Sequence, residues 1–175
     1  MTSRFPLPLL ALLAASVGCA LAAGDVRAVN VQRSFVQNAT GACQSALPVF
    51  DGQIRKRPLA VQNEGNASAF VSCSFTVTDR TAGGFDDILL YSDNNTGSTI
   101  DMTCTMITGT TGTTITAYPK TLSLPANSKT NLFRWRPVDN GGQNFDSYTI
   151  NVSCNLPVGT GLTVSFLYFN ENIGL

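Results

Sequence analysis

The sequence of 175 residues contains no histidine. Histidine is the commonest metal ligand and the usual general base near neutral pH, so Ser-His-Asp, Cys-His and histidine-based zinc sites are excluded. Charged residues are also scarce, at 13% against an average of about 25%. Lys plus Arg equals Asp plus Glu at 11 each, so no field of one sign attracts nucleic acid. We therefore expect a protein that is not an enzyme, uses no cofactor and does not bind nucleic acid.

The sequence also lacks an apolar run of the roughly 20 residues that a membrane-spanning helix needs. Its N-terminus carries a shorter pattern, in which Arg4 precedes an apolar run over 7–17 and then Ala20-Leu21-Ala22. A basic start, a short apolar core and an Ala-x-Ala end are the three parts of a secretory signal peptide. We expect residues 1–23 to be removed, leaving one domain over 24–175 that is secreted or periplasmic and has no membrane span.

One of the five cysteines, Cys19, falls in this leader. Lipidation of Cys19 is the alternative to its removal, but Ser16-Val17-Gly18 matches a lipoprotein signal poorly. The other four form an even set, which in an exported chain indicates a disulfide framework: Cys43, Cys73, Cys104 and Cys154. They allow three pairings, and we favour Cys43 with Cys73 and Cys104 with Cys154.

Apolar and polar residues alternate in four segments, 71–77, 100–106, 148–156 and 162–168. A period of two predicts strands with one buried face and one wet face. In the last segment it places Leu162, Val164, Phe166 and Tyr168 on the buried face. Weaker strand patterns occupy 26–36, 59–62, 88–92, 113–118, 121–124 and 130–136. With Gly- and Asn-rich turns between them, these segments predict an all-β fold, an antiparallel β-sandwich of about eight strands stapled by disulfides.

Several short motifs resemble those of uncharacterised small secreted four-cysteine proteins of Gram-negative bacteria. They are Cys43, Ala60-Val61-Gln62-Asn63, Asn66-Ala67-Ser68, Val71-Ser72-Cys73, Cys104-Thr105, and Cys154-Asn155-Leu156-Pro157 followed by Gly159 and Gly161, with Tyr148 six residues before the last cysteine. The chain departs from that pattern at Ser74-Phe75, where a Pro-Leu pair often follows the second cysteine. The resemblance implies an extracytoplasmic β-sandwich and brings no catalytic residues.

Three sets of residues are candidates for a site. Oxygen ligands for calcium could come from Asp86-Asp87, Asp93-Asn94-Asn95, Asp139, Asn140 and Asp146, although none has EF-hand spacing and turn chemistry explains most of them. A sugar-stacking face could come from Trp135, Tyr91, Tyr118, Tyr148 and Tyr168, although the alternation of Trp135 with Arg134 and Arg136 favours a core position. The basic trio Arg55-Lys56-Arg57 has no interleaved aromatic residue and is typical of a solvated edge or loop.

The sequence thus predicts a secreted, non-enzymatic binding or envelope-associated module of unknown ligand, with a surface glycan as one partner to consider. The alternative is a structural subunit of a surface fibre or layer, which self-associates through strand edges at 26–36 or 162–169. An extracellular hydrolase is the third hypothesis, and the missing histidine and scarce glutamates disfavour it.

Overall fold

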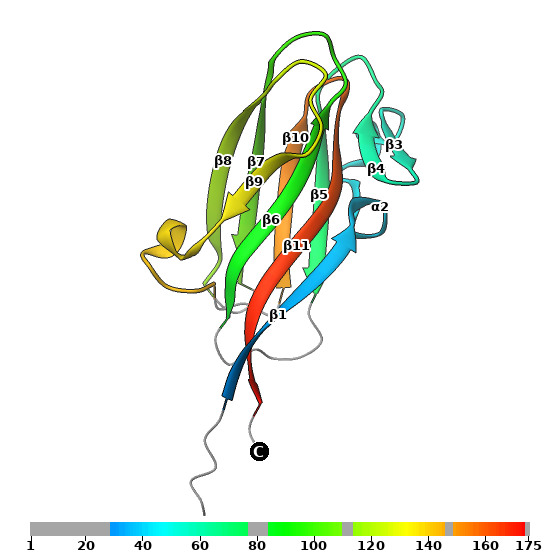
Figure 1. Cartoon of the computed structure of the whole chain (residues 1–175). Coiled ribbons are helices and arrows are strands. Elements are labelled where there is room, and N and C mark those ends of the chain that lie inside the picture. Colours follow the sequence, from blue (N-terminus) through cyan, green and yellow to red (C-terminus); the bar gives the residue numbers. More distant parts are fainter. Residues whose placement is uncertain (1–28, 77–83, 110–113, 146–148, 174–175) are drawn as a thin grey trace, which may run out of the picture.

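The computed structural model describes residues 29–76, 84–109, 114–145 and 149–173, which form two antiparallel sheets packed face to face (Figure 1). The predicted all-β sandwich is confirmed. The first sheet has the order β3, β4, β11, β6 and β9, and β1 pairs with the later part of β11. Its strands are β3 (Ile54–Arg57), β4 (Ala60–Asn63), β11 (Thr160–Ile173), β6 (Phe85–Asn94), β9 (Asn131–Trp135) and β1 (Val29–Asn38).

The second sheet has five strands in the order β2, β5, β10, β7 and β8. They are β2 (Cys43–Ser45), β5 (Ala69–Thr76), β10 (Thr149–Leu156), β7 (Ile100–Thr108) and β8 (Thr116–Leu124). Short helical turns lie between some of the strands, namely α2 (Ala39–Ala42), η2 (Pro48–Phe50) and η3 (Pro137–Asn140). Asn38 caps α2, because its Oδ1 accepts a hydrogen bond of 2.9 Å from the Thr40 backbone N–H.

The core lies between the two inner faces and contains Trp135, Phe133, Phe75 and Phe145, all at most 2% exposed. The Trp135 ring satisfies its one donor within the core, because Nε1 donates to the Tyr118 carbonyl at 2.9 Å. The alternation around Trp135 therefore predicted its position correctly, since Arg134 on the same strand is exposed.

Both disulfides lie on the inner face of the second sheet. Cys43 on β2 is bonded to Cys73 on β5, and Cys104 on β7 is bonded to Cys154 on β10. The two cysteines of each bond are directly opposite one another in the strand pairing, so each bond fastens two neighbouring strands of one sheet. Among the described residues, the first sheet holds no disulfide.

Two strand predictions need correction, and two short strands were missed. The segments 113–118 and 121–124 belong to one strand, β8, which continues through Pro119. Proline has no N–H to donate, and an edge strand such as β8, which has β7 on one side only, is where a sheet tolerates it. The short strands β2 and β3 were not predicted, because three or four residues are too few to show an alternation.

The alternation predicted for β11 is wrong beyond Leu162. Leu162 pairs with Ser92 of β6 and Ser165 pairs with Leu90, so Thr163 and Val164 together face Tyr91 alone. This β-bulge shifts the phase of the strand by one residue. Leu162 remains in the core, but Leu167 and Phe169 are buried after it, while Val164, Phe166 and Tyr168 are not.

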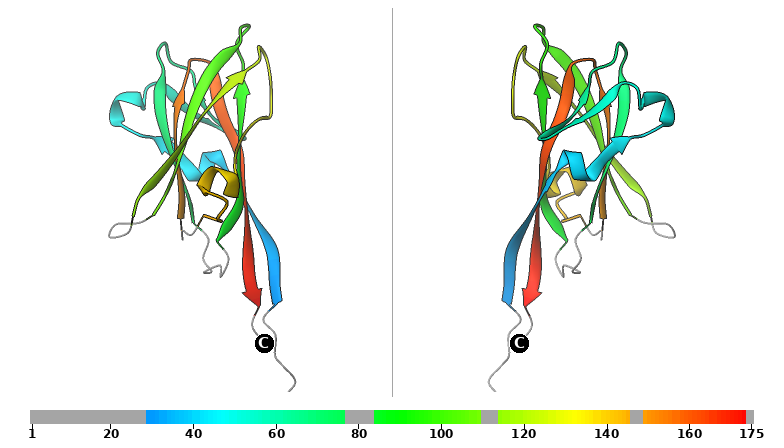
Figure 2. Two further views of the ribbon diagram at one scale, coloured as in Figure 1. Left: turned by 90° about the vertical axis from the view of Figure 1, so that its left-hand side faces the viewer. Right: turned by 90° about the vertical axis from the view of Figure 1, so that its right-hand side faces the viewer.

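The end of β11 and the start of β1 form a two-stranded ribbon that projects from the sandwich (Figure 2). Val29 is paired with Ile173 at the tip of this ribbon, and Asn38 is paired with Val164 near the body. Most β1 side chains are exposed, since Phe35 is the one that packs against the core. β1 is therefore held mainly by its ladder with β11.

Candidate functional site

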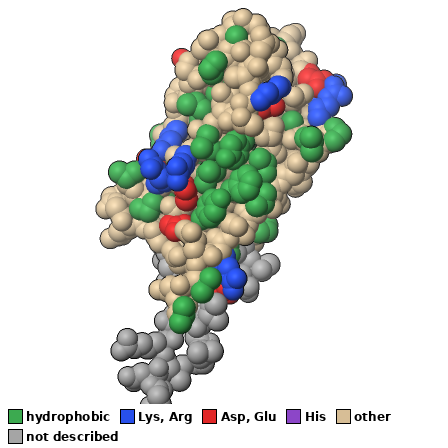
Figure 3. Space-filling model, viewed as in Figure 1, with side chains coloured by type: hydrophobic (Ala, Val, Ile, Leu, Met, Phe, Trp, Pro, Cys, Tyr) green, Lys and Arg blue, Asp and Glu red, His purple; other side chains and the backbone are tan. Residues whose placement is uncertain are grey.

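The outer face of the first sheet carries a group of apolar side chains, visible as a central green area in Figure 3. Strand pairing and burial place seven residues in it, which we name the outer-face patch: Val36, Leu89, Tyr91, Leu132, Val164, Phe166 and Tyr168. They come from four neighbouring strands, β1, β11, β6 and β9. All but Leu89, which is 9% exposed, are partly or fully open to solvent.

Phe166 lies at the centre of the outer-face patch. It is paired with Val36 of β1 on one side and with Leu89 of β6 on the other. The ring of Tyr91 meets the ring of Phe166 edge to face, with centroids 5.8 Å apart. Directly opposite residues on one face of a sheet have Cβ atoms about 5 Å apart, so these side chains form one continuous surface. The bulge in β11 is what turns Phe166 outward into this surface.

A charged pair borders the outer-face patch on its β9 side. Arg134 Nη2 lies 2.5 Å from Asp87 Oδ2, and Arg134 Nε donates to Asp87 Oδ1 at 2.8 Å. The hydrogen bond and the charge of Asp87 raise the pKa of Arg134 further above its usual value. The pair is neutral as a unit, so it offers hydrogen-bonding groups beside the apolar surface without a net charge.

A polar row borders the patch beyond Tyr168, next to the Arg134–Asp87 pair. Asp86 Oδ2 accepts hydrogen bonds from Gln32 Nε2 at 2.8 Å and from Asn170 Nδ2 at 3.3 Å. The second carboxylate oxygen, Oδ1 of Asp86, is buried and has no hydrogen-bond partner among the described residues.

The outer face of the second sheet has a different composition, rich in hydroxyl and amide side chains. A shallow hollow of about 420 Å³ lies on it beside β2, β5 and β10. Its polar lining comes from Gln44, Ser72, Ser74, Asn151 and Ser153. No charged side chain of the described residues lines this hollow, and its ordinary cross-strand polar pairs are what a solvated sheet face shows.

Two buried asparagines brace the loops at the end of the sandwich away from the ribbon. Asn94 Nδ2 donates to the carbonyls of Ser98, Leu124 and Pro125 at 2.8–3.0 Å. Asn63 does the same at the end of β4, where Nδ2 donates to the carbonyls of Ala67 and Leu156, both at 2.8 Å. Each side chain thus donates hydrogen bonds to loop carbonyls that would otherwise have no partner.

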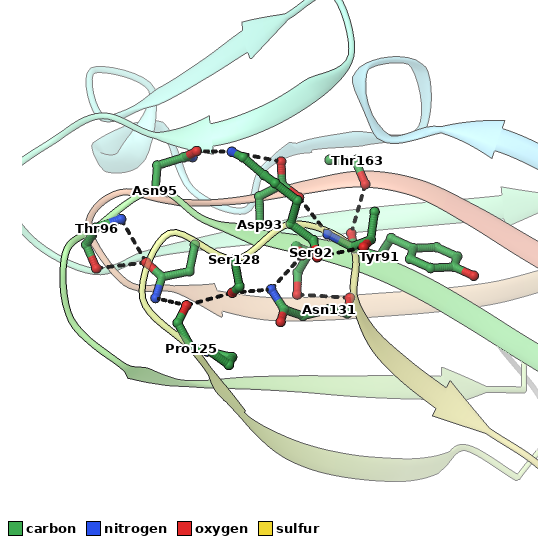
Figure 4. Close-up of polar contacts among 12 residues, drawn as sticks. Tyr91, Ser92, Asp93, Asn95, Thr96, Pro125, Ser128, Asn131 and Thr163 are labelled. Atoms are coloured by element: carbon green, nitrogen blue, oxygen red, sulfur yellow. Dashed lines mark hydrogen bonds and ion pairs between the residues drawn. The ribbon is translucent and has the colours of Figure 1, made fainter.

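A polar network surrounds the end of β6 beside Asn94 (Figure 4). Asn131 Nδ2 donates to the Ser92 carbonyl at 3.1 Å and to Ser128 Oγ at 2.8 Å. Asp93 accepts from the Thr130 backbone N–H at 3.2 Å and forms an ion pair of 3.4 Å with Lys129. Figure 4 shows the side chain of Tyr91, a member of the outer-face patch, pointing away from this network.

The acidic residues considered as calcium ligands do not converge. Asp86 and Asp87 lie at the outer-face patch, while Asp93 pairs with Lys129 at the loop end. Asp139 pairs with Lys120 Nζ at 2.7 Å, on the side of the molecule where β8 faces η3. Partial burial alone raises the pKa of Asp139, but hydrogen bonds from Lys120 and the Arg136 backbone outweigh it and lower the pKa below its usual value. In the part of the chain that the structure describes, no three His, Cys, Asp or Glu side chains are grouped as metal ligands would be.

The predicted sugar-stacking set is only partly brought together. Tyr91 and Tyr168 share the outer-face patch, whereas Trp135 is in the core. Tyr118 packs edge to face on Phe145, and its hydroxyl donates to Asn140 Oδ1 at 2.7 Å. Tyr148 and Asp146 lie outside the described residues. Phe166, the central residue of the patch, was missed because strict alternation placed it in the core.

The basic trio forms most of the edge strand β3, where all three side chains are exposed. Arg57 is paired with Glu64, with both nitrogen–oxygen distances at 2.6 Å. The hydrogen bond from Arg57 lowers the pKa of Glu64.

Among the residues that the structure describes, no helix is long and apolar enough to cross a membrane.

No protein-family model matches the sequence, and no curated protein is significantly similar to it. Several solved structures are distantly similar to the chain. The carbohydrate-binding module TmCBM61 in complex with β-1,4-galactotriose has a TM-score of 0.39 and 11% identity, over 79% of this chain and 88% of that one. A family two carbohydrate esterase from Cellvibrio japonicus has a TM-score of 0.46 and 11% identity, over 83% of this chain but 36% of that one.

A family 11 carbohydrate-binding module from Clostridium thermocellum, in complex with a β-1,3-1,4-mixed-linked tetrasaccharide, has a TM-score of 0.38 and 10% identity. The match covers 88% of this chain and 94% of that module. Likeness at this level concerns the arrangement of strands, and no residue of these proteins is carried over to this chain.

Proposed function

We propose that this protein is a secreted or periplasmic, non-catalytic binding module that holds a neutral polysaccharide chain against its outer-face patch. The observation that carries the proposal is the bulge in β11, which turns Val164, Phe166 and Tyr168 away from the core. The first sheet gathers several apolar side chains into one exposed patch, and such patches mark interaction sites more often than single exposed residues do. The secretory leader, the disulfides and the resemblance to small exported proteins support the location.

The chemistry around the patch favours a sugar chain. Pyranose rings have apolar C–H faces, which pack on aromatic rings, and hydroxyl rims, which need hydrogen-bonding groups nearby. The patch supplies Tyr91, Phe166 and Tyr168 for the first need. The neighbouring Arg134–Asp87 pair and the exposed Gln32 supply the second. Because Arg134 is neutralised, an uncharged ligand fits this surface better than an acidic one.

The carboxylates of the described residues support a non-catalytic role. A hydrolase of glycosidic bonds needs one protonated and one ionised carboxyl group flanking a cleft. Here Asp87, Asp93 and Asp139 are each paired with Lys or Arg, and so are the two glutamates. The partners of Glu64 and Asp139 lower the pKa of these two carboxyl groups, which therefore have no proton to donate near neutral pH.

Binding can be tested on the full chain, expressed with its leader and purified from the extracytoplasmic fraction. Hydroxyethyl cellulose, galactomannan and a soluble β-1,3-glucan serve as neutral probes, and alginate as an acidic one. We expect saturable binding of at least one neutral probe in affinity electrophoresis and calorimetry. Tyr168→Ala should weaken it at least about tenfold, because truncating an aromatic hot-spot residue costs more than about 1.4 kcal/mol.

Phe70→Ala is the matched control, because Phe70 is an exposed aromatic residue on β5 of the second sheet. It should leave the affinity for the same probe unchanged. Equal losses in Tyr168→Ala and Phe70→Ala, or no binding of any neutral probe, would count against the proposal.

The fibre or surface-layer subunit remains the second proposal. One observation favours it, namely that β1 forms an open edge of the first sheet. An open edge can accept a strand from a second chain.

A further inference from the structure

We infer that two copies of this chain pair through the free edges of their β1 strands, antiparallel and about a two-fold axis. Among the described residues, β1 forms a ladder with β11 alone, so its other edge presents unpaired backbone groups along ten residues. Unpaired edges readily join to a second strand, and proteins that stay monomeric protect them.

The other edge strands of the described structure carry such protection. β2 has three residues and β9 has five. β3 has four residues, three of them charged. β8 is longer but contains Pro119 and Lys120, and the Lys120 ammonium donates to the Arg134 carbonyl of β9 at 2.6 Å, which partly closes that side. Shortness, charge and proline are the usual means of blocking an edge.

β1 shows none of these features. It is ten residues long and contains no proline. Its one charged residue, Arg33, is neutralised on the same sheet by Glu171, with Nε 2.8 Å from Oε2. Only a register with Arg33 opposite itself would bring like charges together, and every neighbouring register avoids this. The length, composition and charge of β1 therefore leave its free edge unprotected against pairing with another strand.

The occupant that suits this edge is a second copy of the same strand. Antiparallel pairing of two β1 strands uses the same surface of both chains and closes at a dimer. The two-fold axis then stands perpendicular to the sheet, so both outer faces point the same way. β1 itself contributes Val36 to the outer-face patch, and the two patches would lie on one continuous surface.

This arrangement has a consequence that rests on the proposed function. Two patches on one surface could hold one polysaccharide chain at two places, which raises the apparent affinity without any new contact. Pairing itself does not depend on a glycan. Measurements of mass without ligand therefore test the dimer separately from the binding proposal.

The test is the native mass of the full exported chain, measured by light scattering after size-exclusion chromatography and by sedimentation. We expect the mass of two chains. Ser34→Lys should halve it, because Ser34 is an exposed residue in the middle of β1, and a lysine on an edge strand opposes pairing with another strand. Ser123→Lys, at an exposed position on the edge strand β8, is the matched control and should remain dimeric.

Phe166→Ala separates edge pairing from association through the patch, and it should also remain dimeric. A single-chain mass at every concentration, a Ser34→Lys variant that stays dimeric, or a Phe166→Ala variant that dissociates would each overturn the inference. An assembly larger than two chains would overturn the closed pair as well.

Discussion

The outer faces of the two sheets differ in composition although both sheets cover the same core. The first sheet exposes aromatic and aliphatic side chains around Phe166 and has no disulfide among its described strands. The second exposes hydroxyl and amide groups, and both disulfides fasten its strands from the inside. The outer face of an antiparallel sheet is usually polar, because it is in contact with water. A cluster of apolar side chains on an outer face is therefore the unusual case.

The difference indicates a division of roles. The second sheet contributes covalent rigidity, and the first carries the apolar surface to which we assign the proposed binding. Stability and binding should then respond to different substitutions, and three sets of variants can separate them.

The largest effect is expected from the second sheet. Replacing Cys104 and Cys154 together by alanine releases a loop with a sequence separation of 50, and we expect a loss of about 4 kcal/mol in the free energy of unfolding. The Cys43 and Cys73 double variant, with a separation of 30, should lose about 0.5 kcal/mol less on the same chain-entropy relation. Urea unfolding measures both.

Glycan affinity of the two disulfide variants, measured while they are still folded, should be unchanged. If a fully folded disulfide variant lost much of its glycan affinity, the second sheet would contribute to binding as well as to stability.

The next effect concerns adjacent residues on β11. Leu167 is completely buried, and Leu167→Ala should lower the free energy of unfolding by about 3 kcal/mol because it leaves a cavity. Phe166→Ala removes a larger side chain but should cost less than about 1 kcal/mol, because Phe166 faces outward. Urea unfolding of both variants is decisive, since uninterrupted alternation along β11 would give the opposite order.

The smallest effect comes from the ion pair that bridges the two sheets. Lys120 lies on β8 and Asp139 on η3, beyond β9, and Asp139→Asn should cost about 0.5–1 kcal/mol at neutral pH. The pKa of Asp139 is lowered in the folded protein, so its contribution is complete above its unfolded pKa of about 3.9 and is lost as the pH falls through the folded value.

Unfolding curves of wild type and Asp139→Asn should accordingly differ at pH 7 and converge in acid. A difference that persists at the lowest pH would assign the loss to packing of the side chain and not to its charge.

The sandwich could be predicted from the sequence because alternation over seven or more residues fixes both the strand and its buried face. Strands β5, β7 and β10 follow their patterns throughout. One pairing of the cysteines could be favoured, but the other two could not be excluded, since four cysteines allow three pairings whatever the strand order.

The outer-face patch could not be predicted, because it depends on one extra residue in β11. A bulge at Thr163 and Val164 carries no glycine that would mark it, and its phase shift appears only when β11 is paired with β6. The ion-pair partner of each aspartate could not be predicted from the sequence either. Asp87 and Arg134 are 47 positions apart and meet because β6 lies beside β9.

The pairing of Val29 with Ile173 at the tip of the ribbon has a mechanical consequence. A pulling force between these two residues acts across the β1–β11 ladder, so it peels the strands apart one pair at a time and meets little resistance. A force between Val29 and the loop after Asn94, at the other end of the sandwich, acts along the strands instead. It loads the whole ladder in shear. The force needed to unfold the protein should therefore be low for the first pair of attachment points and high for the second.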